Sequence, residues 1–281
     1  MKKVIKKASA KINLTLDILG VSGSYHLLES LVCSTKLCDK ITVKKRKDNK
    51  ITLKMKGLAV DCATTDNNAF KAAALFKKRF NTCGVDIVIE KNIPVGGGLG
   101  GSSADVAGVL NAMQKLFSLD VDLSGIANEL SSDAYYMLKG GFAVMRGRGD
   151  RATWLDYDKK LYFVIFSDKE SVSSRACYKA FDDLGKTYDK RTEQVVNALV
   201  GGKDEEFLGA LKNDLYEPAI TLNPNIELNL IALKSVGAQG VVMSGSGSSV
   251  VGVFTEKEKR DKVYKILLSR FGNRIIKTET V

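Results

Sequence analysis

The chain has 281 residues, of which 44% are hydrophobic and only 3 are proline, which excludes a largely disordered protein and allows one large domain or two smaller ones. Its 43 basic residues exceed its 32 acidic residues by 11, so an acidic ligand or a nucleic acid is an expected partner. One histidine excludes His-rich zinc sites, and no apolar stretch has the length of a signal core or a membrane span, so we expect a cytoplasmic protein.

The five cysteines include no Cys-x-x-Cys pair, and their odd number argues against a complete disulfide framework. Free thiols in a reducing compartment are therefore expected at the following positions: Cys33, Cys38, Cys62, Cys83 and Cys177.

Residues 8–20 alternate between apolar and polar side chains, which predicts one strand with a polar face. Lys11 and Asn13 lie on that polar face and point the same way. A lysine on a strand is usually solvated, so the residues alone assign Lys11 no role. His26, preceded by Tyr25, is the only histidine, and a lone histidine is more often structural than catalytic.

The positive charge is concentrated at the N-terminus and in the segment KKRKDNK at 44–50. This segment lies between two strand-like stretches, ITV and ITLKM, which predicts a hairpin turn with solvated lysines. No aromatic residues are interleaved with these charges, as a surface for single-stranded nucleic acid would prefer.

Residues 66–80 place alanine and phenylalanine at helical spacing, which predicts a helix capped by Asp66 or Asn67. Core packing explains this apolar stripe without any ligand.

A strand is predicted at 85–90, and Pro94 ends it. The stretch PVGGGLGGSSADVA then leads directly into a helix that continues to Phe117; we call residues 94–104 the glycine loop. Glycines let the backbone approach a ligand, and the free amides of a following helix favour a phosphate. Ser102 and Ser103 can cap that helix or bind phosphate and its metal, and Asp105 is expected in its first turn.

The spacing excludes several other phosphate-binding proteins. No Lys follows the last glycine, so the loop is not a Walker motif. Gly96, Gly98 and Gly101 match the dinucleotide pattern, but Pro94 separates them from the strand and the expected acidic residue on a second strand is missing. The chain also has neither an HRD nor a DFG segment, which excludes a protein kinase.

Asp133 follows two serines and precedes a short helical run, so it is a predicted N-cap that could also accept a proton. From Leu155 onward the pattern predicts a second α+β domain. Its predicted elements are a strand at 161–166, helices at 175–184, 191–200, 205–216 and 225–236, two strands around SGSGSS, and a final helix at 257–271. The SGSGSS loop by itself fits a simple hairpin turn.

The pattern P-x-x-x-G-L-G-G-S-S-A-D in the glycine loop resembles the phosphate-binding motif of the GHMP kinases. SAKINLTLDILG with Tyr25-His26, KNDLYEPAI at 212–220 and GAQGVVMSGSGSSVVGVF at 237–254 are similar to one family among them, the 4-diphosphocytidyl-2-C-methylerythritol kinases. The similarity runs nearly end to end, with matching order and spacing.

This resemblance implies an α+β, two-domain GHMP kinase fold. An N-terminal ATP-binding domain like domain 2 of ribosomal protein S5 would span 1–154, and a ferredoxin-like C-terminal domain would span 155–281. The implied reaction is ATP- and Mg²⁺-dependent phosphorylation of the 2-hydroxyl of 4-diphosphocytidyl-2-C-methyl-D-erythritol, in the non-mevalonate isoprenoid pathway. The implied partner is this small cytidyl diphosphate substrate, with no membrane and no nucleic acid, and the implied assembly is a monomer or homodimer.

The resemblance also implies residue roles. Lys11 would neutralise charge on the transferring phosphate, Asn13 would line the acceptor site, and Asp133 would accept the proton of the substrate hydroxyl. Tyr25 and His26 would recognise cytosine. Substrate contacts are implied for Ser246 and Gly247, an adenine contact for Asn67, a magnesium contact for Ser103, and phosphate contacts for the whole glycine loop, namely Pro94, Val95, Gly96, Gly97, Gly98, Leu99, Gly100, Gly101, Ser102, Ser103 and Ala104.

The chain departs from the family pattern in two segments. Gly23-Ser24 precede Tyr25-His26 in a slightly shorter loop that commonly ends in Asp-Gly-Tyr-His; in the glycine loop, Ser102 stands where glycine is common and Ala104 where a further serine is frequent. Two alternatives remain open: a GHMP kinase of the mevalonate or homoserine type, and a basic nucleic-acid-binding module. The Tyr25-His26 pair and the 212–220 segment argue against the first, and the combination of Lys11, Asp133 and the glycine loop argues against the second.

Overall fold

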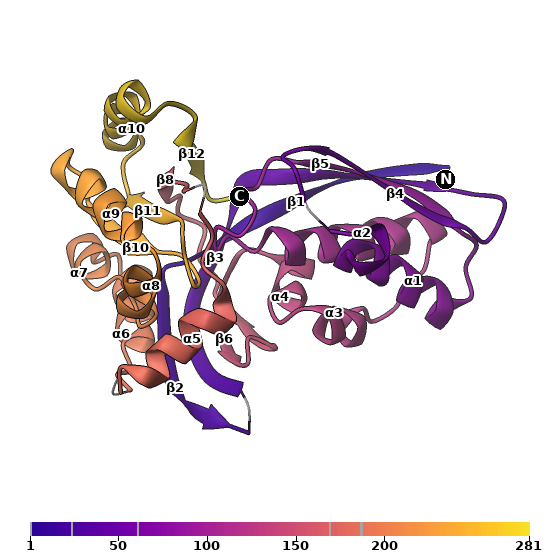
Figure 1. Ribbon diagram of the computed structural model, residues 1–281, viewed down its shortest axis with the longest axis horizontal. Helices are drawn as coiled ribbons and strands as arrows, with labels where there is room; N and C mark the ends of the chain where they lie inside the picture. The colour runs from indigo at the N-terminus through magenta and orange to yellow at the C-terminus, as the bar shows by residue number, and fades with distance from the viewer. Residues whose placement is uncertain (1, 24, 61, 169, 186–187) are drawn as a thin grey trace. The chain divides into compact units, whose positions relative to one another are not determined.

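The computed structural model describes residues 2–23, 25–60, 62–168, 170–185 and 188–281 (Figure 1). These fall into two compact units. Unit 1 comprises Met1–Ala10, Leu37–Val95 and Gly100–Gly140, and unit 2 comprises Lys11–Lys36, Gly96–Leu99 and Gly141–Val281. The expected domain boundary after residue 154 falls in the connection between strands β7 and β8, and it stays a prediction.

The strands are β1 (Lys3–Asn13), β2 (Thr15–Ser22), β3 (Tyr25–Lys45), β4 (Ile51–Gly57), β5 (Val85–Lys91), β6 (Phe142–Gly147), β7 (Arg151–Trp154), β8 (Tyr162–Phe166), β9 (Lys212–Asn213), β10 (Gly240–Met243), β11 (Val250–Phe254) and β12 (Ile275–Glu279). The α-helices are α1 (Asn68–Phe80), α2 (Gly101–Phe117), α3 (Ser124–Leu130), α4 (Ala134–Lys139), α5 (Ser174–Asp183), α6 (Thr192–Val200), α7 (Asp204–Gly209), α8 (Tyr216–Leu222), α9 (Asn225–Ser235) and α10 (Lys257–Phe271).

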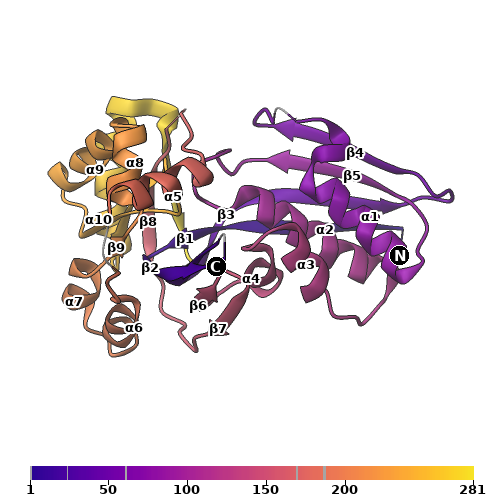
Figure 2. The ribbon, with the colours of Figure 1, turned by 60° about the horizontal axis from the view of Figure 1, so that its bottom comes forward.

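In unit 1, β5 pairs parallel with β4 and antiparallel with the end of β3, and helices α1 and α2 cover one face of this sheet (Figures 1 and 2). Alternate residues of β5 are buried, from Val85 through Ile87 and Ile89, which places its apolar side chains under the helices. The predicted strand at 85–90 and the predicted helix after the glycine loop are both confirmed.

The predicted hairpin around 44–50 is wrong. The strand order is β4-β5-β3, so β5 lies between the two strands that the basic segment connects. A turn-rich segment between two strands gives no information on whether those strands pair with each other or with a third, and here β5 arrives from 40 residues further along the chain. The predicted solvation of the lysines is confirmed: Lys44, Lys47 and Lys50 are exposed.

The single strand predicted at 8–20 is two strands, because the chain bends at Leu14 between β1 and β2. Its polar face is also buried: Lys11 and Asp17 are 5% and 0% exposed. Alternation could not reveal either feature, since the bend interrupts no periodicity and the covering partners come from distant parts of the chain.

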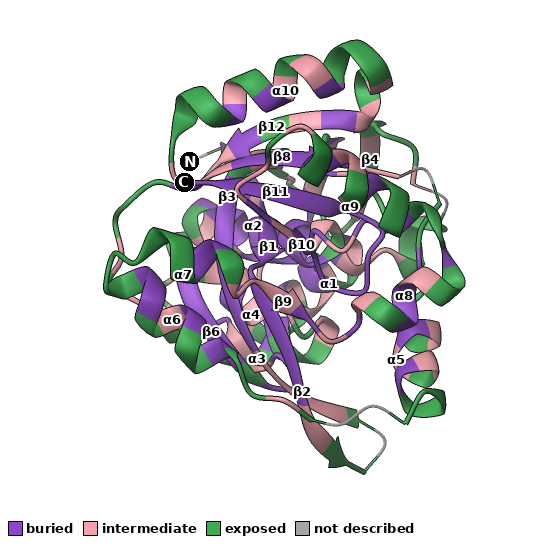
Figure 3. Cartoon of the chain, turned by 90° about the vertical axis from the view of Figure 1, so that its left-hand side faces the viewer, coloured by how far each residue is buried: buried purple, intermediate pink, exposed green. Residues whose placement is uncertain are grey.

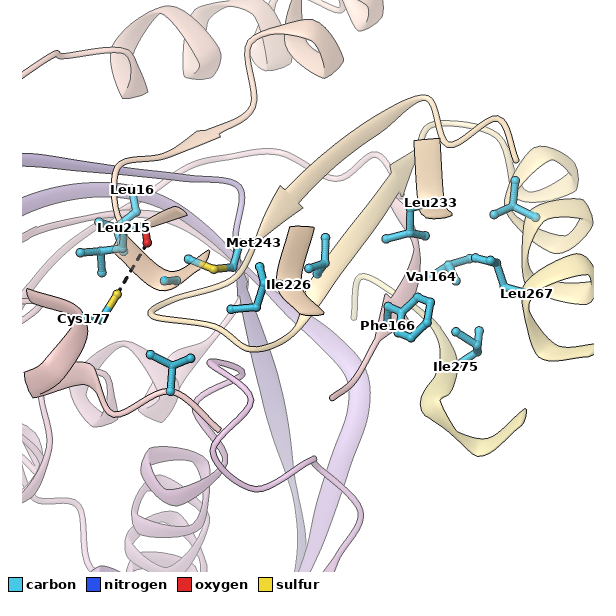
Figure 4. Packing of buried hydrophobic residues seen from close by; sticks show 14 of the residues in the cluster. Leu16, Val164, Phe166, Cys177, Leu215, Ile226, Leu233, Met243, Leu267 and Ile275 are labelled. Atoms are coloured by element: carbon cyan, nitrogen blue, oxygen red, sulfur yellow. Dashed lines mark hydrogen bonds between the residues drawn. The ribbon is translucent and has the colours of Figure 1, made fainter. Parts of the chain in front are cut away.

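In unit 2, an antiparallel sheet of order β10-β11-β8-β12 forms the centre of the C-terminal region. Buried residues of α9 and α10 belong to one hydrophobic cluster with residues of this sheet, and Figure 3 shows exposed residues along much of both helices. The hydrophobic core that the sheet shares with these helices contains Val164, Phe166, Ile226, Leu233 and Met243 (Figure 4).

The prediction for this region is correct for β8, α5, α6, α9, β10, β11 and α10. The helix predicted at 205–216 is correct only in its first part: α7 ends at Gly209, and Lys212–Asn213 form β9, which pairs parallel with β2. Strand β12 was not predicted. Both strands exist through pairings with distant segments, which local periodicity does not encode.

Among the described residues, no helix combines the length and the apolar character that crossing a membrane would require.

Candidate active site

Within unit 2, the first part of the glycine loop, Gly96–Leu99, lies against Ser244–Ser249, which we call the serine–glycine loop. The hydroxyl of Ser244 donates to the carbonyl of Gly98 at 3.0 Å. Gly98 has a φ of +73°, and a Cβ there would lie 2.0 Å from the Ser244 carbonyl oxygen. Only glycine fits this position, because the two backbones are in direct contact.

Asn213 anchors the serine–glycine loop from β9. Its side-chain amide donates to the carbonyls of Met243 and Gly245, both at 2.7 Å, and its oxygen accepts from the amide of Leu215 at 2.9 Å. The side chain is buried, so all these groups would be costly to leave unpaired. Sequence reasoning missed this residue, because the pairings with Met243 and Gly245 cross 30 and 32 positions of the chain.

The structure brings Lys11 and Asn13 to these two loops, also within unit 2. The backbone amide of Lys11 donates to Leu99 at 3.0 Å, and its ammonium donates to the side-chain oxygen of Asn13. Asn13 in turn donates from its backbone to the Ser244 hydroxyl at 3.1 Å and from its side chain to Ser30 at 2.8 Å. The expected common direction of Lys11 and Asn13 is confirmed.

The remaining hydroxyls of the serine–glycine loop are also buried. The Ser246 hydroxyl lies 2.8 Å from that of Ser174. A Cβ on Gly247, whose φ is +86°, would meet Met243 at 3.0 Å. The hydroxyls of Ser248 and Ser249 have no hydrogen-bond partner among the described residues. Two buried hydroxyls of this loop thus have unsatisfied hydrogen-bonding capacity.

The second part of the glycine loop lies in unit 1, where α2 begins. Gly100 occupies the N-cap with a φ of 72°. Ser102 is exposed, whereas Ser103 is buried, with its hydroxyl 2.5 Å from that of Ser131. Ala104 is 1% exposed and packs in the interior. Of the predicted polar residues, only Ser102 presents an exposed hydroxyl at the helix start.

Asp105 was expected in the first turn of α2, but it lies just beyond that turn. There its carboxylate accepts a hydrogen bond from Lys91 at 2.7 Å. Burial, opposed by Lys91 and reinforced by the neighbouring Asp39 carboxylate, raises the pKa of Asp105 to about 7. The sequence contained a sign of this cluster: Lys91 continues the buried positions of β5, and a lysine on an apolar face needs a carboxylate partner.

Asn67 caps α1, since its side chain accepts from the amide of Ala69 at 2.9 Å, so the predicted cap is confirmed at Asn67. Its side-chain nitrogen lies 3.7 Å from the sulfur of Cys62. The adenine contact implied for Asn67 stays a prediction.

Asp133 occupies the predicted N-cap position of α4 in unit 1, but no side-chain hydrogen bond caps this helix. Asp133 is half-buried. The predicted side-chain cap is thus not formed, and the role of Asp133 as a base stays a prediction.

His26 packs on α5 within unit 2. Its Nε2 lies 2.7 Å from the Asp182 carboxylate, and its ring stacks on Tyr178 with centroids 4.8 Å apart. Tyr25 is 54% exposed, with the Arg148 guanidinium 4.6 Å from its ring centroid. Asp182 and Tyr178 were not predicted. Ser24, where the loop departs from the family pattern, lies outside the described residues.

The described residues hold no group of three Asp, Glu, His or Cys side chains that could bind a metal ion. The buried carboxylates nearest the helix start, Asp39 and Asp105, both accept from Lys91.

Comparison with known proteins identifies the family. The sequence models for the N-terminal and C-terminal domains of GHMP kinases match residues 67–143 and 198–274. The chain therefore belongs to the GHMP kinases, which are ATP-dependent small-molecule kinases, and the predicted α+β GHMP fold is confirmed.

Two relatives named 4-diphosphocytidyl-2-C-methyl-D-erythritol kinase narrow the class. That of Macrococcus caseolyticus is 33% identical over 94% of this chain and 95% of its own, and that of Desulfitobacterium hafniense is 35% identical over 94% and 91%. A crystal structure of 4-(cytidine 5'-diphospho)-2C-methyl-D-erythritol kinase superposes with a TM-score of 0.83, at 29% identity, over 99% of this chain and 100% of that one. Within the GHMP kinases, the chain belongs to this family.

Proposed function

We propose that the protein transfers the γ-phosphoryl group of ATP to the 2-hydroxyl of 4-diphosphocytidyl-2-C-methyl-D-erythritol, giving the 2-phosphate and ADP in the non-mevalonate pathway. The observation that carries this proposal is the contact of Lys11 and Asn13 with both loops in unit 2. That arrangement joins a cation, an amide and glycine-rich backbone, which are groups that can position a phosphate and stabilise its charge during phosphoryl transfer.

Phosphoryl transfer depends on positioning and on charge stabilisation, so each group needs only to bind or to move a proton. The amides at the start of α2 would bind the nucleotide phosphates. The Lys11 ammonium, held by Asn13, would neutralise charge that develops on the transferring group. The Asp133 carboxylate would accept the proton from the substrate hydroxyl as the oxygen attacks phosphorus.

Tyr25 and His26 are proposed to recognise the cytosine. The exposed ring of Tyr25 offers a stacking surface, and His26 is oriented by its contacts with Asp182 and Tyr178. Ser246 and Gly247 are proposed substrate contacts.

Magnesium is proposed to arrive with ATP, and it would offset the negative charge of the phosphates. Mg²⁺ usually keeps several waters and binds few protein groups beside substrate phosphates. The proposed protein contact is the hydroxyl of Ser103, which is buried and already shares a hydrogen bond with that of Ser131. A cytoplasmic location, a monomeric or homodimeric state and the absence of a nucleic-acid partner belong to the same proposal.

The test is release of ADP with Mg²⁺ and ATP, comparing 4-diphosphocytidyl-2-C-methyl-D-erythritol with mevalonate, homoserine and no acceptor. We expect turnover with the cytidyl substrate alone. Turnover with another acceptor would support the proposed ATP site and contradict the recognition of cytosine by Tyr25 and His26. No turnover with any acceptor would favour the alternative of a nucleic-acid-binding module.

Asp133→Asn should lower kcat by about 10²- to 10⁴-fold with little change in ATP binding, because only the proton acceptor is lost. The matched control is Asp122→Asn: Asp122 also precedes a helix in unit 1, where it accepts from Ser124. Near-normal turnover of Asp133→Asn would remove the role assigned to Asp133.

A further inference from the structure

Three charged side chains are buried in unit 1 where the glycine loop starts and where it ends. Lys91 is the last residue of β5, Asp39 lies on β3 and Asp105 lies on α2. Their side chains are 4%, 0% and 6% exposed. The family resemblance assigned no role to any of them.

Asp39 holds the chain that enters the glycine loop. One of its carboxylate oxygens accepts from the backbone amides of Asn92 and Ile93, at 2.6 and 2.9 Å. Its other oxygen accepts from the Lys91 ammonium. The two residues that precede Pro94 are thereby fixed to β3.

Lys91 connects this entrance to the exit of the loop. Its ammonium donates to Asp105 at 2.7 Å and lies 3.5 Å from the carbonyl of Gly101, the first residue of α2. A Cβ on Gly101 would lie 3.3 Å from the same ammonium nitrogen. One cation thus contacts the first residue of the helix, a carboxylate just beyond its first turn, and the carboxylate that fixes the entrance.

Stability alone is a poor reason for such a cluster. Desolvating three charges costs several kcal/mol for each ion, and apolar residues of similar volume often stabilise a protein equally well. Moreover, the second carboxylate oxygen of Asp105 is buried and has no hydrogen-bond partner among the described residues. What the charges do provide is directional bonds between two chain segments.

We propose that Lys91, together with Asp39 and Asp105, is the positioning residue of the nucleotide-phosphate site. It fixes the segment at Asn92–Ile93 relative to the first turn of α2, whose amides receive the phosphates. This inference rests on the proposed function only in taking that helix start as the nucleotide site. Lys91 acts through the backbone and does not itself touch the nucleotide.

The central experiment compares three proteins: wild type, Lys91→Arg, and the double variant Lys91→Met/Asp105→Leu. The double variant replaces the Lys91–Asp105 pair by apolar side chains and removes the connection, while the Asp39 carboxylate loses its cation but keeps its hydrogen bonds from the amides of Asn92 and Ile93. Binding of Mg·ADP by calorimetry, the KM values for ATP and for the acceptor, and the free energy of unfolding are measured for each.

We expect the double variant to fold, to bind Mg·ADP about 10- to 100-fold more weakly and to raise the KM for ATP similarly, because a small misplacement of the loop is costly. The KM for the acceptor should change by less than about 3-fold. Lys91→Arg should bind Mg·ADP more tightly than the double variant, since it keeps the positive charge at position 91. A folded double variant with Mg·ADP affinity within about 2-fold of wild type would overturn the proposal.

Asp39→Asn and Asp17→Asn form a matched pair that separates positioning from stability. Asp17 is also fully buried and also accepts from two successive amides, those of Arg191 and Thr192 at 2.8 and 2.7 Å, but it lies in unit 2. Both variants should lose stability, and only Asp39→Asn should lose Mg·ADP affinity. Equal losses of affinity in the two would overturn the proposal.

Mg·ADP binding also separates this inference from the proposed function. A wild-type protein that binds Mg·ADP but does not phosphorylate the cytidyl substrate would contradict the proposed acceptor and leave the role of Lys91 testable. An unchanged affinity in the variants beside normal wild-type turnover would contradict the inference alone.

Discussion

Gly98 and Gly101 stand three residues apart in one motif, yet a methyl group at the two positions would meet very different surroundings. At Gly98 it would lie 2.0 Å from a backbone oxygen of the serine–glycine loop, on a residue with positive φ. At Gly101 it would lie 3.3 Å from two side-chain atoms, Cγ2 of Ile93 and Nζ of Lys91, and from no backbone atom, on a helical residue. A glycine-rich motif therefore combines positions required for packing of one backbone on another with positions that tolerate a side chain.

Gly98→Ala offers the strongest test of this difference. The left-handed conformation costs a non-glycine residue about 1–2 kcal/mol, and the overpacking adds about 1–3 kcal/mol. We expect a loss of about 2–5 kcal/mol in the free energy of unfolding, measured in urea. The matched control is Gly237→Ala, because Gly237 has a φ of +91° and nothing within 4 Å of its added Cβ, so it should lose only the conformational part. Equal losses would mean that the contact with Ser244 contributes nothing.

Asn213→Asp tests the other side of the same contact. The substitution keeps the oxygen that accepts from Leu215 but replaces two donors by a carboxylate oxygen facing the Met243 and Gly245 carbonyls. Leaving these buried groups unpaired should cost about 2–4 kcal/mol and should lower kcat, since the displaced loop also contacts Asn13 through Ser244.

Asn223→Asp is the control for that variant. Asn223 is also buried and also accepts from the amide two residues on, at 3.1 Å, but its nitrogen donates to Glu170 at 3.3 Å and not to the serine–glycine loop. It should lose stability and keep kcat. An equal fall of kcat in both variants would show that the loop is not held by Asn213.

The next residue, Asp214, predicts a pH effect on the anchor of the loop. Burial raises the pKa of Asp214, although Lys212 and the amide of Ile18 oppose the shift. A raised carboxyl pKa means that the folded state holds the proton more tightly, so this group makes the protein less stable as pH rises above the ordinary carboxyl range. Asp214→Asn should remove that decline.

Asp189 gives the opposite expectation from the same lysine. Hydrogen bonds from Arg191 and Lys212 lower the pKa of Asp189, so its contribution is present at neutral pH and is lost as pH falls below the ordinary carboxyl range. Unfolding free energies of Asp214→Asn and Asp189→Asn, measured from about pH 2 to about pH 8, should therefore differ from wild type with slopes of opposite sign, above the ordinary carboxyl range for Asp214 and below it for Asp189. Slopes of the same sign would reject the assignment of burial as the cause at Asp214.

Gly101→Ala should have the smallest effect. Alanine favours the helix by up to about 1 kcal/mol, and the tight contacts with Ile93 and Lys91 offset part of this gain. We expect a change below about 1 kcal/mol in either direction. A loss of stability comparable to that of Gly98→Ala would contradict the distinction drawn between Gly98 and Gly101.

The sequence predicted the elements whose evidence is local. The alternation of β5, the helical spacing of α2 and the bounds of α10 were recovered because each depends on neighbouring residues. The family was predicted from motifs that keep their order along the chain, and the comparison with known proteins confirmed it.

What the sequence did not predict depends on contacts between distant residues. The two residues of β9 form a strand only because β2 lies beside them, and Asn213 is important only because the serine–glycine loop folds back onto it. Asp182 contacts the imidazole of His26 although the two residues are 156 positions apart in the sequence. Lys91 is the exception, since its place on the apolar face of β5 was visible and was overlooked.

The division of the chain has a consequence for engineering. The path crosses between the units inside β1, inside β3, on both sides of Gly96–Leu99 and after Gly140. Neither unit is a continuous segment, so no single cut in the gene can release one of them intact. A chimera that takes one unit from a relative would have to exchange all three chain segments of that unit. Foreign segments are better inserted at surface turns than at the midpoint of the sequence.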